Sequence, residues 1–183
     1  MHKPKRQSFN MPGHAHFLTF SCYQRFPVFS NEFACNLLAE TIDQARDILK
    51  LELLSYVFMP DHVHMLIRPQ SPEYSIPQIL KSIKGPFAKK LIDKLKSNHD
   101  NILNHLEIST SKGIGYRVWE RGGGFDRNLY SNDKVCAAIT YIEQNPVRKG
   151  LVSETTDWMW SSAGARTNDK NVPLLIESLD SLI

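Results

Sequence analysis

Two apolar segments, residues 51–59 and 62–68, follow one another with only Pro60 and Asp61 between them. Proline and aspartate in this position are typical of a tight turn, so we expect two strands joined by a tight connection. Pro69 ends the second strand, because proline cannot donate a hydrogen bond to a sheet. This strand pair constrains the fold most, since every other segment has to be arranged around it.

The rest of the chain alternates between patterns typical of strands and patterns typical of helices. The further predicted strands are residues 16–23 and 116–120, and the predicted helices are residues 31–50, 75–97 and 132–145. Ser30 or Asn31 is expected to cap the first helix, and Pro146 to end the third. Gly85-Pro86 predicts a kink or a break in the second helix. The polar residues 98–115 are expected to form a loop.

The order of these elements is strand, helix, strand, strand, helix, strand, helix. The first six match the ferredoxin-like βαββαβ unit. We therefore predict an α+β fold with one antiparallel sheet, helices on one face, the third strand beside the first, and an added C-terminal helix. The length of 183 residues fits one domain over residues 1–162 and a C-terminal tail over residues 163–183. This fold by itself does not indicate a function, because unrelated activities share it.

The composition excludes several classes of protein. Apolar residues make up 42% and charged residues 22% of the chain, which is ordinary for a globular protein and excludes a disordered one. No apolar run approaches the ~18 residues of a membrane span, and none of signal-peptide type follows the basic N-terminus. The three cysteines lie far apart, which argues against a disulfide framework or a zinc knuckle. We therefore expect a reduced, cytoplasmic protein.

The net charge of +3 is distributed unevenly along the chain. Residues 78–97 contain six lysines and one acid, so this segment carries +5 and the rest of the chain −2. The lysines are Lys81, Lys84, Lys89, Lys90, Lys94 and Lys96. Such a segment indicates a phosphate-rich partner, although a solvated helix face would have the same composition.

His62-Val63-His64 begins the third predicted strand. Because side chains alternate along a strand, both imidazoles face one side, ~6–7 Å apart along the backbone, where they could bind one metal ion. A hydrogen-bonded, semi-buried pair has the same spacing, which also occurs in His14-Ala15-His16. In the predicted topology His62 and His64 lie opposite residues 21–23, and the other pair lies ~20 Å away. We expect His14 and His16 at the surface or toward a nucleic acid, outside the metal site.

The third predicted helix carries Tyr141 and Asn145, which are four residues apart and therefore share a helix face. Ile139 and Ile142 of this helix are expected to pack on the sheet. Asn145 precedes proline, so it ends the helix and its amide oxygen is free to turn toward a ligand. The alternative is a packed tyrosine followed by an ordinary helix-ending asparagine.

Two blocks of the chain resemble the signature blocks of the single-tyrosine HUH transposases: residues 58–67, Phe-Met-Pro-Asp-His-Val-His-Met-Leu-Ile, and residues 141–152, Tyr-Ile-Glu-Gln-Asn-Pro-Val-Arg-Lys-Gly-Leu-Val. Within that family the chain is most similar to the REP-associated tyrosine transposases, which are related to the smallest insertion-sequence transposases. Residues 119–121, 125–127 and 158–162 are also similar to this group. The resemblance runs from about residue 17 to residue 162.

The resemblance implies a metal-dependent enzyme that cleaves and rejoins single-stranded DNA next to hairpins formed by imperfect palindromes. Tyr141 would be the nucleophile and form a 5′-phosphotyrosine intermediate, and His62, His64 and Asn145 would hold a divalent cation. Gln144 is an alternative to Asn145 as the third ligand. Two imidazoles and one oxygen suit Mg²⁺ or Mn²⁺. The sequence lacks a phosphate-binding loop, so no nucleotide cofactor is expected.

The expected DNA contacts are of two kinds. The cations expected to contact the DNA backbone are Lys81, Lys84, Lys89, Lys90, Arg121 and Arg127. Unpaired bases would stack on Tyr23, Tyr116 or Phe125, unless these rings pack in the core. A nucleoid-associated monomer or homodimer is expected. The alternatives are a catalytically silent hairpin-binding protein on the same fold, an RNA-binding module, and a metallohydrolase with water as the nucleophile.

Overall fold

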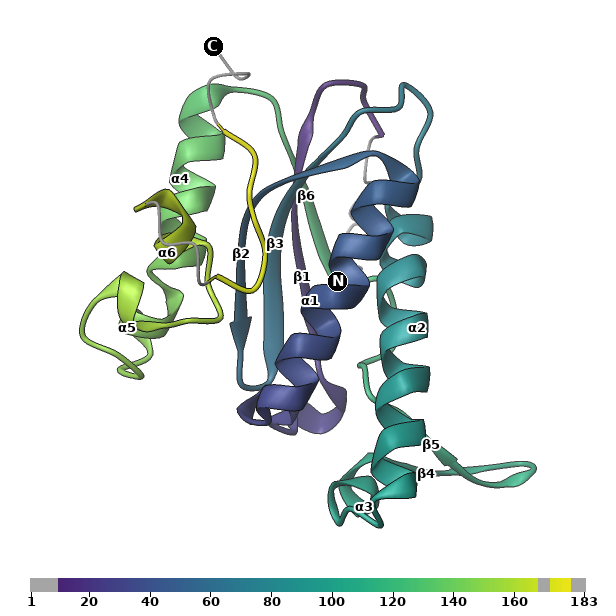
Figure 1. Ribbon diagram of the computed structural model, residues 1–183. Coiled ribbons are helices and arrows are strands. Elements are labelled where there is room, and N and C mark those ends of the chain that lie inside the picture. The colour runs from purple at the N-terminus through teal and green to yellow at the C-terminus, as the bar shows by residue number, and fades with distance from the viewer. Residues whose placement is uncertain (1–9, 168–171, 179–183) are drawn as a thin grey trace, which may run out of the picture.

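The computed structural model describes residues 10–167 and 172–178 of the chain. Its centre is an antiparallel sheet in the order β2-β3-β1-β6. The four strands are β1 (Ala15–Ser21), β2 (Leu51–Met59), β3 (His62–Pro69) and β6 (Phe125–Leu129). Helices α1 (Glu32–Leu49) and α2 (Ile76–Ser97) cover one face of this sheet (Figure 1). The ferredoxin-like α+β fold is confirmed, with β3 beside β1.

The main core lies between the sheet and these two helices. Alternate residues of the strands, such as Leu18 and Phe20 of β1, meet the apolar stripes of α1 and α2 there. Asn31 caps α1, because its side chain accepts a hydrogen bond from the Ala34 N–H. Lys50 ends α1 in the left-handed conformation, which turns the chain directly into β2. Two short 3₁₀ turns, η1 (Tyr23–Arg25) and η2 (Val28–Ser30), connect β1 to α1.

Helix α2 is continuous through Gly85 and Pro86, so of the predicted kink or break the break is wrong, and the kink stays a prediction. Proline in a helix interior removes one backbone hydrogen bond and crowds the preceding turn. Apolar residues on both sides of this point, among them Ile83 and Phe87, are fully buried in the core. Their packing maintains the helical path despite the local cost.

The fourth strand of the sheet is Phe125–Leu129, so its prediction at residues 116–120 is wrong. Residues 117–120 instead run beside the end of β1, where the Glu120 N–H donates to the Ser21 carbonyl. The predicted loop contains α3 (Ile102–Leu106) and a hairpin of β4 (Glu107–Thr110) and β5 (Gly113–Tyr116). The polar residues Asp126 and Asn128 interrupt the apolar pattern of this strand, so the sequence pattern did not predict it.

Helix α4 (Asn132–Glu143) lies on the opposite face of the sheet from α1 and α2 (Figure 1). Ile139 and Ile142 pack there on Leu54, Val57 and Leu66, which confirms their predicted contact with the sheet. The helix ends at Glu143, two residues earlier than predicted, and a short helix α5 (Asn145–Arg148) follows. Pro146 has no N–H to continue the α4 hydrogen bonds, which explains the early end.

The segment after α5 covers the free edge of β2. It contains η3 (Thr155–Asp157) and α6 (Ala163–Arg166). The Phe58 N–H donates to the Trp160 carbonyl, and the Ser162 N–H donates to the Tyr56 carbonyl. Further along, the Glu177 N–H donates to the Leu53 carbonyl, so residues 172–178 follow the same edge. The division into a domain over residues 1–162 and a tail over 163–183 stays a prediction. Among the described residues, no helix combines the length and apolar character needed to cross a membrane.

Candidate active site

The two histidines of β3 lie side by side on the sheet face that α4 covers. The register of β1 and β3 places His62 opposite Ser21 and His64 opposite Thr19. Their ring centroids are 4.8 Å apart. Val63, between them, points into the core on the other face. The alternation predicted from the sequence therefore holds, and both imidazoles are available to one ligand.

A neighbouring oxygen orients each imidazole through its Nδ1 atom. Nδ1 of His64 shares a hydrogen bond of 2.7 Å with Oγ1 of Thr19, and Nδ1 of His62 donates to Oδ1 of Asp61 at 2.6 Å. The Arg25 guanidinium also donates to the Asp61 carboxylate, at 3.2 Å. Each ring therefore retains its Nε2 atom for another partner, an arrangement typical of metal-binding histidines.

Burial, together with the charge of the neighbouring His62, lowers the pKa of His64 to about 3. His64 is therefore neutral near pH 7, which is the form in which imidazole binds a metal. The pair fits two ligands of a divalent cation. The described residues hold no group of three or more His, Cys, Asp or Glu side chains arranged around a metal position. A third ligand would therefore come from another kind of side chain.

Tyr141, near the end of α4, reaches the histidine pair. Its side chain is 42% exposed, and its ring centroid lies 5.6 Å from that of His64 and 5.7 Å from that of Phe17. The guanidinium carbon of Arg148, in α5, lies 5.1 Å from the centroid of the same ring. The fold thus joins His62, His64 and Tyr141 in one cluster. Phe17 and Thr19 belong to the cluster too, and only the β1–β3 register could have identified them.

Asn145 begins α5 and is only 6% exposed. Because α4 ends before it, Asn145 and Tyr141 do not share one continuous helix face as predicted. In the described part of the chain, no hydrogen bond links its side chain to either imidazole. Its role as third ligand, and that of Gln144 in its place, stay predictions.

His16 is fully buried, so its prediction at the surface is wrong. Its Nδ1 atom lies 2.9 Å from Oδ1 of Asp126, and its Nε2 atom lies 2.8 Å from the Tyr74 hydroxyl. These partners lie on the α2 face of the sheet, because residue 16 has the opposite orientation from Phe17. His14 is partly buried, and its ring packs near Tyr130 at 5.9 Å. His16 is thus a core histidine with two hydrogen-bond partners.

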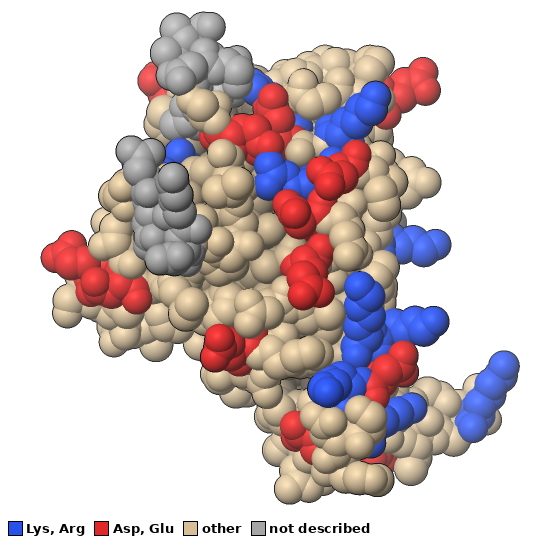
Figure 2. All heavy atoms as spheres, in the orientation of Figure 1, with Lys and Arg blue, Asp and Glu red and all other residues tan. Residues whose placement is uncertain are grey.

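The predicted DNA-contacting cations divide between the two sides of the sheet. Lys81, Lys89 and Lys90 are exposed on α2, across the sheet from Tyr141. Figure 2 shows the basic side chains along the α2 side of the molecule, next to a stripe of acids over α1. Arg127, also exposed, lies on the α4 face, because it is opposite Phe17 in the β1–β6 register.

Lys84 is half-buried and has partners within the protein. Its ammonium donates to the Gly122 carbonyl at 3.1 Å and lies 5.7 Å from the Phe20 ring centroid. Burial lowers its pKa. A hollow of about 380 Å³ extends from Lys84 past Arg121 to Thr19. This hollow extends from the α2 side of the molecule around the start of β6 to Thr19, the hydrogen-bond partner of His64.

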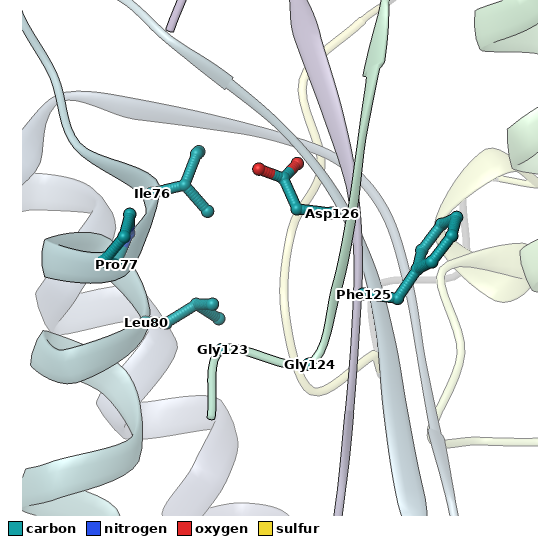
Figure 3. Close-up of a pocket in the computed structure, with 7 residues that line it drawn as sticks. All are labelled: Ile76, Pro77, Leu80, Gly123, Gly124, Phe125 and Asp126. Carbon is teal, nitrogen blue, oxygen red and sulfur yellow. The ribbon is translucent and has the colours of Figure 1, made fainter. Parts of the chain in front are cut away.

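A second hollow, of about 440 Å³, lies between α2 and β6 (Figure 3). Asp126 points into it from β6, opposite Ile76 and Leu80 of α2, and Phe125 points to the other side. The Phe125 ring instead packs at 5.8 Å from Phe17, on the face of Tyr141.

The other two candidate stacking rings each lie beside a cation. The Arg117 guanidinium is 5.1 Å from the Tyr23 ring centroid, and the Lys96 ammonium is 4.8 Å from that of Tyr116. Both rings are partly buried.

The fold and this cluster define a ferredoxin-like protein with a tyrosine beside a paired-histidine motif. Residues 11–145 match the family "Transposase IS200 like". Because this match covers most of the chain, the protein belongs to the IS200-like transposases, and the resemblance seen in its two sequence blocks is confirmed.

Individual relatives agree with this assignment. A Haemophilus influenzae protein named as a REP-associated tyrosine transposase is 23% identical over 151 residues, which cover 82% of this chain and 80% of that protein. The ISDra2 transposase TnpA of Deinococcus radiodurans is 36% identical over 62 residues, 30% of this chain and 44% of that one. The structure of a REP-associated tyrosine transposase bound to a REP hairpin superposes with a TM-score of 0.67 at 15% identity. That match covers 96% of this chain and 92% of the other, and it shows the shared fold.

Proposed function

We propose that this transposase cleaves and rejoins single-stranded DNA next to a hairpin through a covalent bond between Tyr141 and a 5′-phosphate. The observation that carries the proposal is the contact between the Tyr141 and His64 rings, with His62 directly beyond. A nucleophile next to two oriented imidazoles is the arrangement that metal-assisted phosphoryl transfer requires. The hairpin is supported by the relative with the same fold, whose structure contains a REP hairpin.

His62, His64 and Asn145 would hold Mg²⁺ or Mn²⁺. When bound, such a cation would neutralise the phosphate charge and make the phosphorus more electrophilic. Asp61 and Thr19 fix the orientation of the two imidazoles through Nδ1. The Arg148 and Phe17 side chains both pack against the Tyr141 ring.

The reaction forms one bond and breaks one. The Tyr141 phenolic oxygen loses its proton and bonds to phosphorus, and the bond from phosphorus to the 3′-oxygen breaks. The departing 3′-oxygen takes up a proton and becomes a hydroxyl. Attack by another 3′-hydroxyl on the phosphotyrosine reverses these steps and joins two DNA ends. The bond energy is retained in the phosphotyrosine, so no nucleotide is consumed.

A covalent-adduct assay tests this proposal. The protein is incubated with Mn²⁺ or Mg²⁺ and a library of single-stranded oligonucleotides that carry a hairpin next to a randomised segment. We expect a protein–DNA adduct that survives denaturing electrophoresis, that requires the cation, and that Tyr141→Phe abolishes. Tyr130→Phe is the matched control and should retain the adduct, because Tyr130 has no contact with the histidine pair.

Two results would contradict the mechanism. An adduct formed by Tyr141→Phe would mean that another residue is the nucleophile. Hairpin binding that is insensitive to a chelator, without any adduct, would instead identify a catalytically silent DNA-binding protein.

A further inference from the structure

A groove beside Tyr141 lies between α4 and the edge strand β6. Its volume is about 310 Å³, at the lower end of the range for small-ligand sites. We call it the Tyr141 groove; its lining includes Phe17, Arg127, Leu129, Lys134, Ala137 and Tyr141. Most of this lining is apolar, and it includes the Tyr141 ring, which the reaction proposed above would modify. The hollow beside Lys84 and Arg121, in contrast, does not include Tyr141.

Two positive charges flank the Tyr141 groove. Within the part of the chain that the structure describes, neither Arg127 nor Lys134 forms an ion pair with a carboxylate. Lys134 donates a hydrogen bond to the Tyr130 hydroxyl, and its ammonium lies 3.6 Å from the Tyr130 ring centroid. The hydrogen bond from Lys134, together with the charges of Lys134 and Arg127, lowers the pKa of Tyr130. The positive potential of both cations therefore reaches the same region beside the Tyr141 groove, and their charges are available to an anion.

We propose that the Tyr141 groove binds the first nucleotide of the DNA strand that stays attached to Tyr141, with Arg127 and Lys134 contacting the phosphates that follow. This inference rests on the proposed function. The strand with the 5′-phosphate stays bonded to Tyr141 after cleavage, so its first nucleotide has to lie next to that ring. The Tyr141 ring lines the groove, the groove has apolar side chains for a sugar or base, and its volume suits a single nucleotide.

Direct binding tests the groove without any cleavage. The probe is a tetranucleotide of mixed sequence with a 5′-phosphate, and its affinity is measured by fluorescence anisotropy at low salt. We expect the double variant Arg127→Ala/Lys134→Ala to bind about tenfold more weakly than the unaltered protein, because each removed cation removes a phosphate contact. Ala137→Leu fills the groove without a change in charge and should weaken binding to a similar extent.

Lys112→Ala is the control for net charge. Lys112 is exposed on the β4–β5 hairpin, which lies at the opposite end of the molecule from α4 (Figure 1). Its replacement should change the affinity by less than about twofold. If Ala137→Leu and the double variant bind the tetranucleotide as the unaltered protein does, the proposal is wrong.

The adduct assay separates this inference from the proposed function. On substrates that extend several nucleotides beyond the cleaved phosphate, the double variant should form about tenfold less adduct than the unaltered protein. On substrates that end one nucleotide beyond this phosphate, the two proteins should form the same amount. An equal loss on both substrates would overturn the assignment of the groove to the attached strand. If the unaltered protein forms no adduct, the proposed function is wrong. The tetranucleotide measurement does not depend on cleavage, so it still decides whether the groove binds a nucleotide.

Discussion

Thr19 holds His64 in place from the neighbouring strand. The hydrogen bond between its hydroxyl and Nδ1 of His64 is 2.7 Å long, and both groups are largely shielded from water. An imidazole without this partner could rotate and present either nitrogen to a ligand. A threonine that nothing in the local sequence distinguishes thus becomes part of the site.

We expect Thr19→Val to lower cation-dependent adduct formation by about 10- to 100-fold, the usual effect of removing the partner of a metal-binding histidine. Thr19→Ser retains the hydroxyl and should recover most of the activity. The comparison is made as adduct yield against Mn²⁺ concentration, because a weaker site needs more cation for the same yield. Equal curves for the valine and serine variants would show that the hydroxyl does not position His64.

Gly124 allows the chain to pass close to Thr19. Its φ is +78°, and a Cβ built on it would lie 2.1 Å from the Thr19 carbonyl oxygen. Any other residue would therefore have both an unfavourable backbone conformation and a collision with the backbone.

Gly124→Ala should lower the free energy of unfolding by about 2 kcal/mol or more, measured by urea denaturation. Gly123→Ala is its matched control. The nearest atom to a Cβ at Gly123 is Cδ1 of Leu80, at 3.9 Å, so the change should stay within about 0.5 kcal/mol. Similar losses in both variants would mean that the loop as a whole, rather than the approach to Thr19, limits stability.

At the scale of elements, Glu143 anchors the tyrosine helix to the rest of the molecule. Its Oε1 accepts hydrogen bonds from the Ser162 hydroxyl and from Nε of Arg166, each at 2.7 Å. Arg166 also donates to the Leu54 carbonyl, which connects α6 to β2. Glu143 is two residues from Tyr141, so this network fixes the end of α4 that carries the proposed nucleophile.

We expect Glu143→Ala to lower the free energy of unfolding by about 2–3 kcal/mol, because Arg166 and Ser162 lose their acceptor in a largely buried place. Glu40→Ala, on the exposed side of α1, should change it by less than about 0.5 kcal/mol. A double-mutant cycle with Arg166→Ala measures the coupling. Strictly additive effects would show that the two side chains do not act as a pair.

At the scale of the whole molecule, the lysines of α2 and the candidate active site lie on opposite faces of the sheet. A DNA strand that contacts both has to pass around the start of β6. The hollow from Lys84 past Arg121 to Thr19 provides such a path. A strand that passed over α1 instead would meet exposed acids, which repel DNA phosphates. These acids are Glu32, Glu40, Asp43 and Asp47.

If α2 contacts the DNA backbone, each of Lys81→Ala, Lys89→Ala and Lys90→Ala should reduce the slope of log affinity against log salt concentration by about 0.7, the value for a single-stranded phosphate contact. The measurement is a salt titration of hairpin binding. Lys50→Gly is the control, because glycine suits the left-handed backbone of residue 50 and the variant loses one charge outside α2. A slope unchanged in all three variants would remove α2 from the DNA interface.

Local patterns predicted most elements of the fold. The apolar spacing, the Asn31 cap and the Pro60-Asp61 turn placed α1, β2 and β3 within a few residues of their observed bounds. β6 was missed because Asp126 and Asn128 interrupt its apolar pattern, and the partner of Asp126, His16, comes from β1. A kink or a break at Pro86 was predicted because the local cost of proline is visible in the sequence, whereas the packing that offsets this cost is not.

The sequence by itself determined the family, the fold class and the shared orientation of His62 and His64, because side-chain alternation and motif spacing are local properties. Only the tertiary structure decided that α4 crosses to the face opposite α2, that Tyr141 meets His64, and that His16 is buried. Each of these depends on contacts between residues far apart in the chain. Such contacts follow from the order of strands in the sheet and the face on which each helix buries its apolar side, which no single segment encodes.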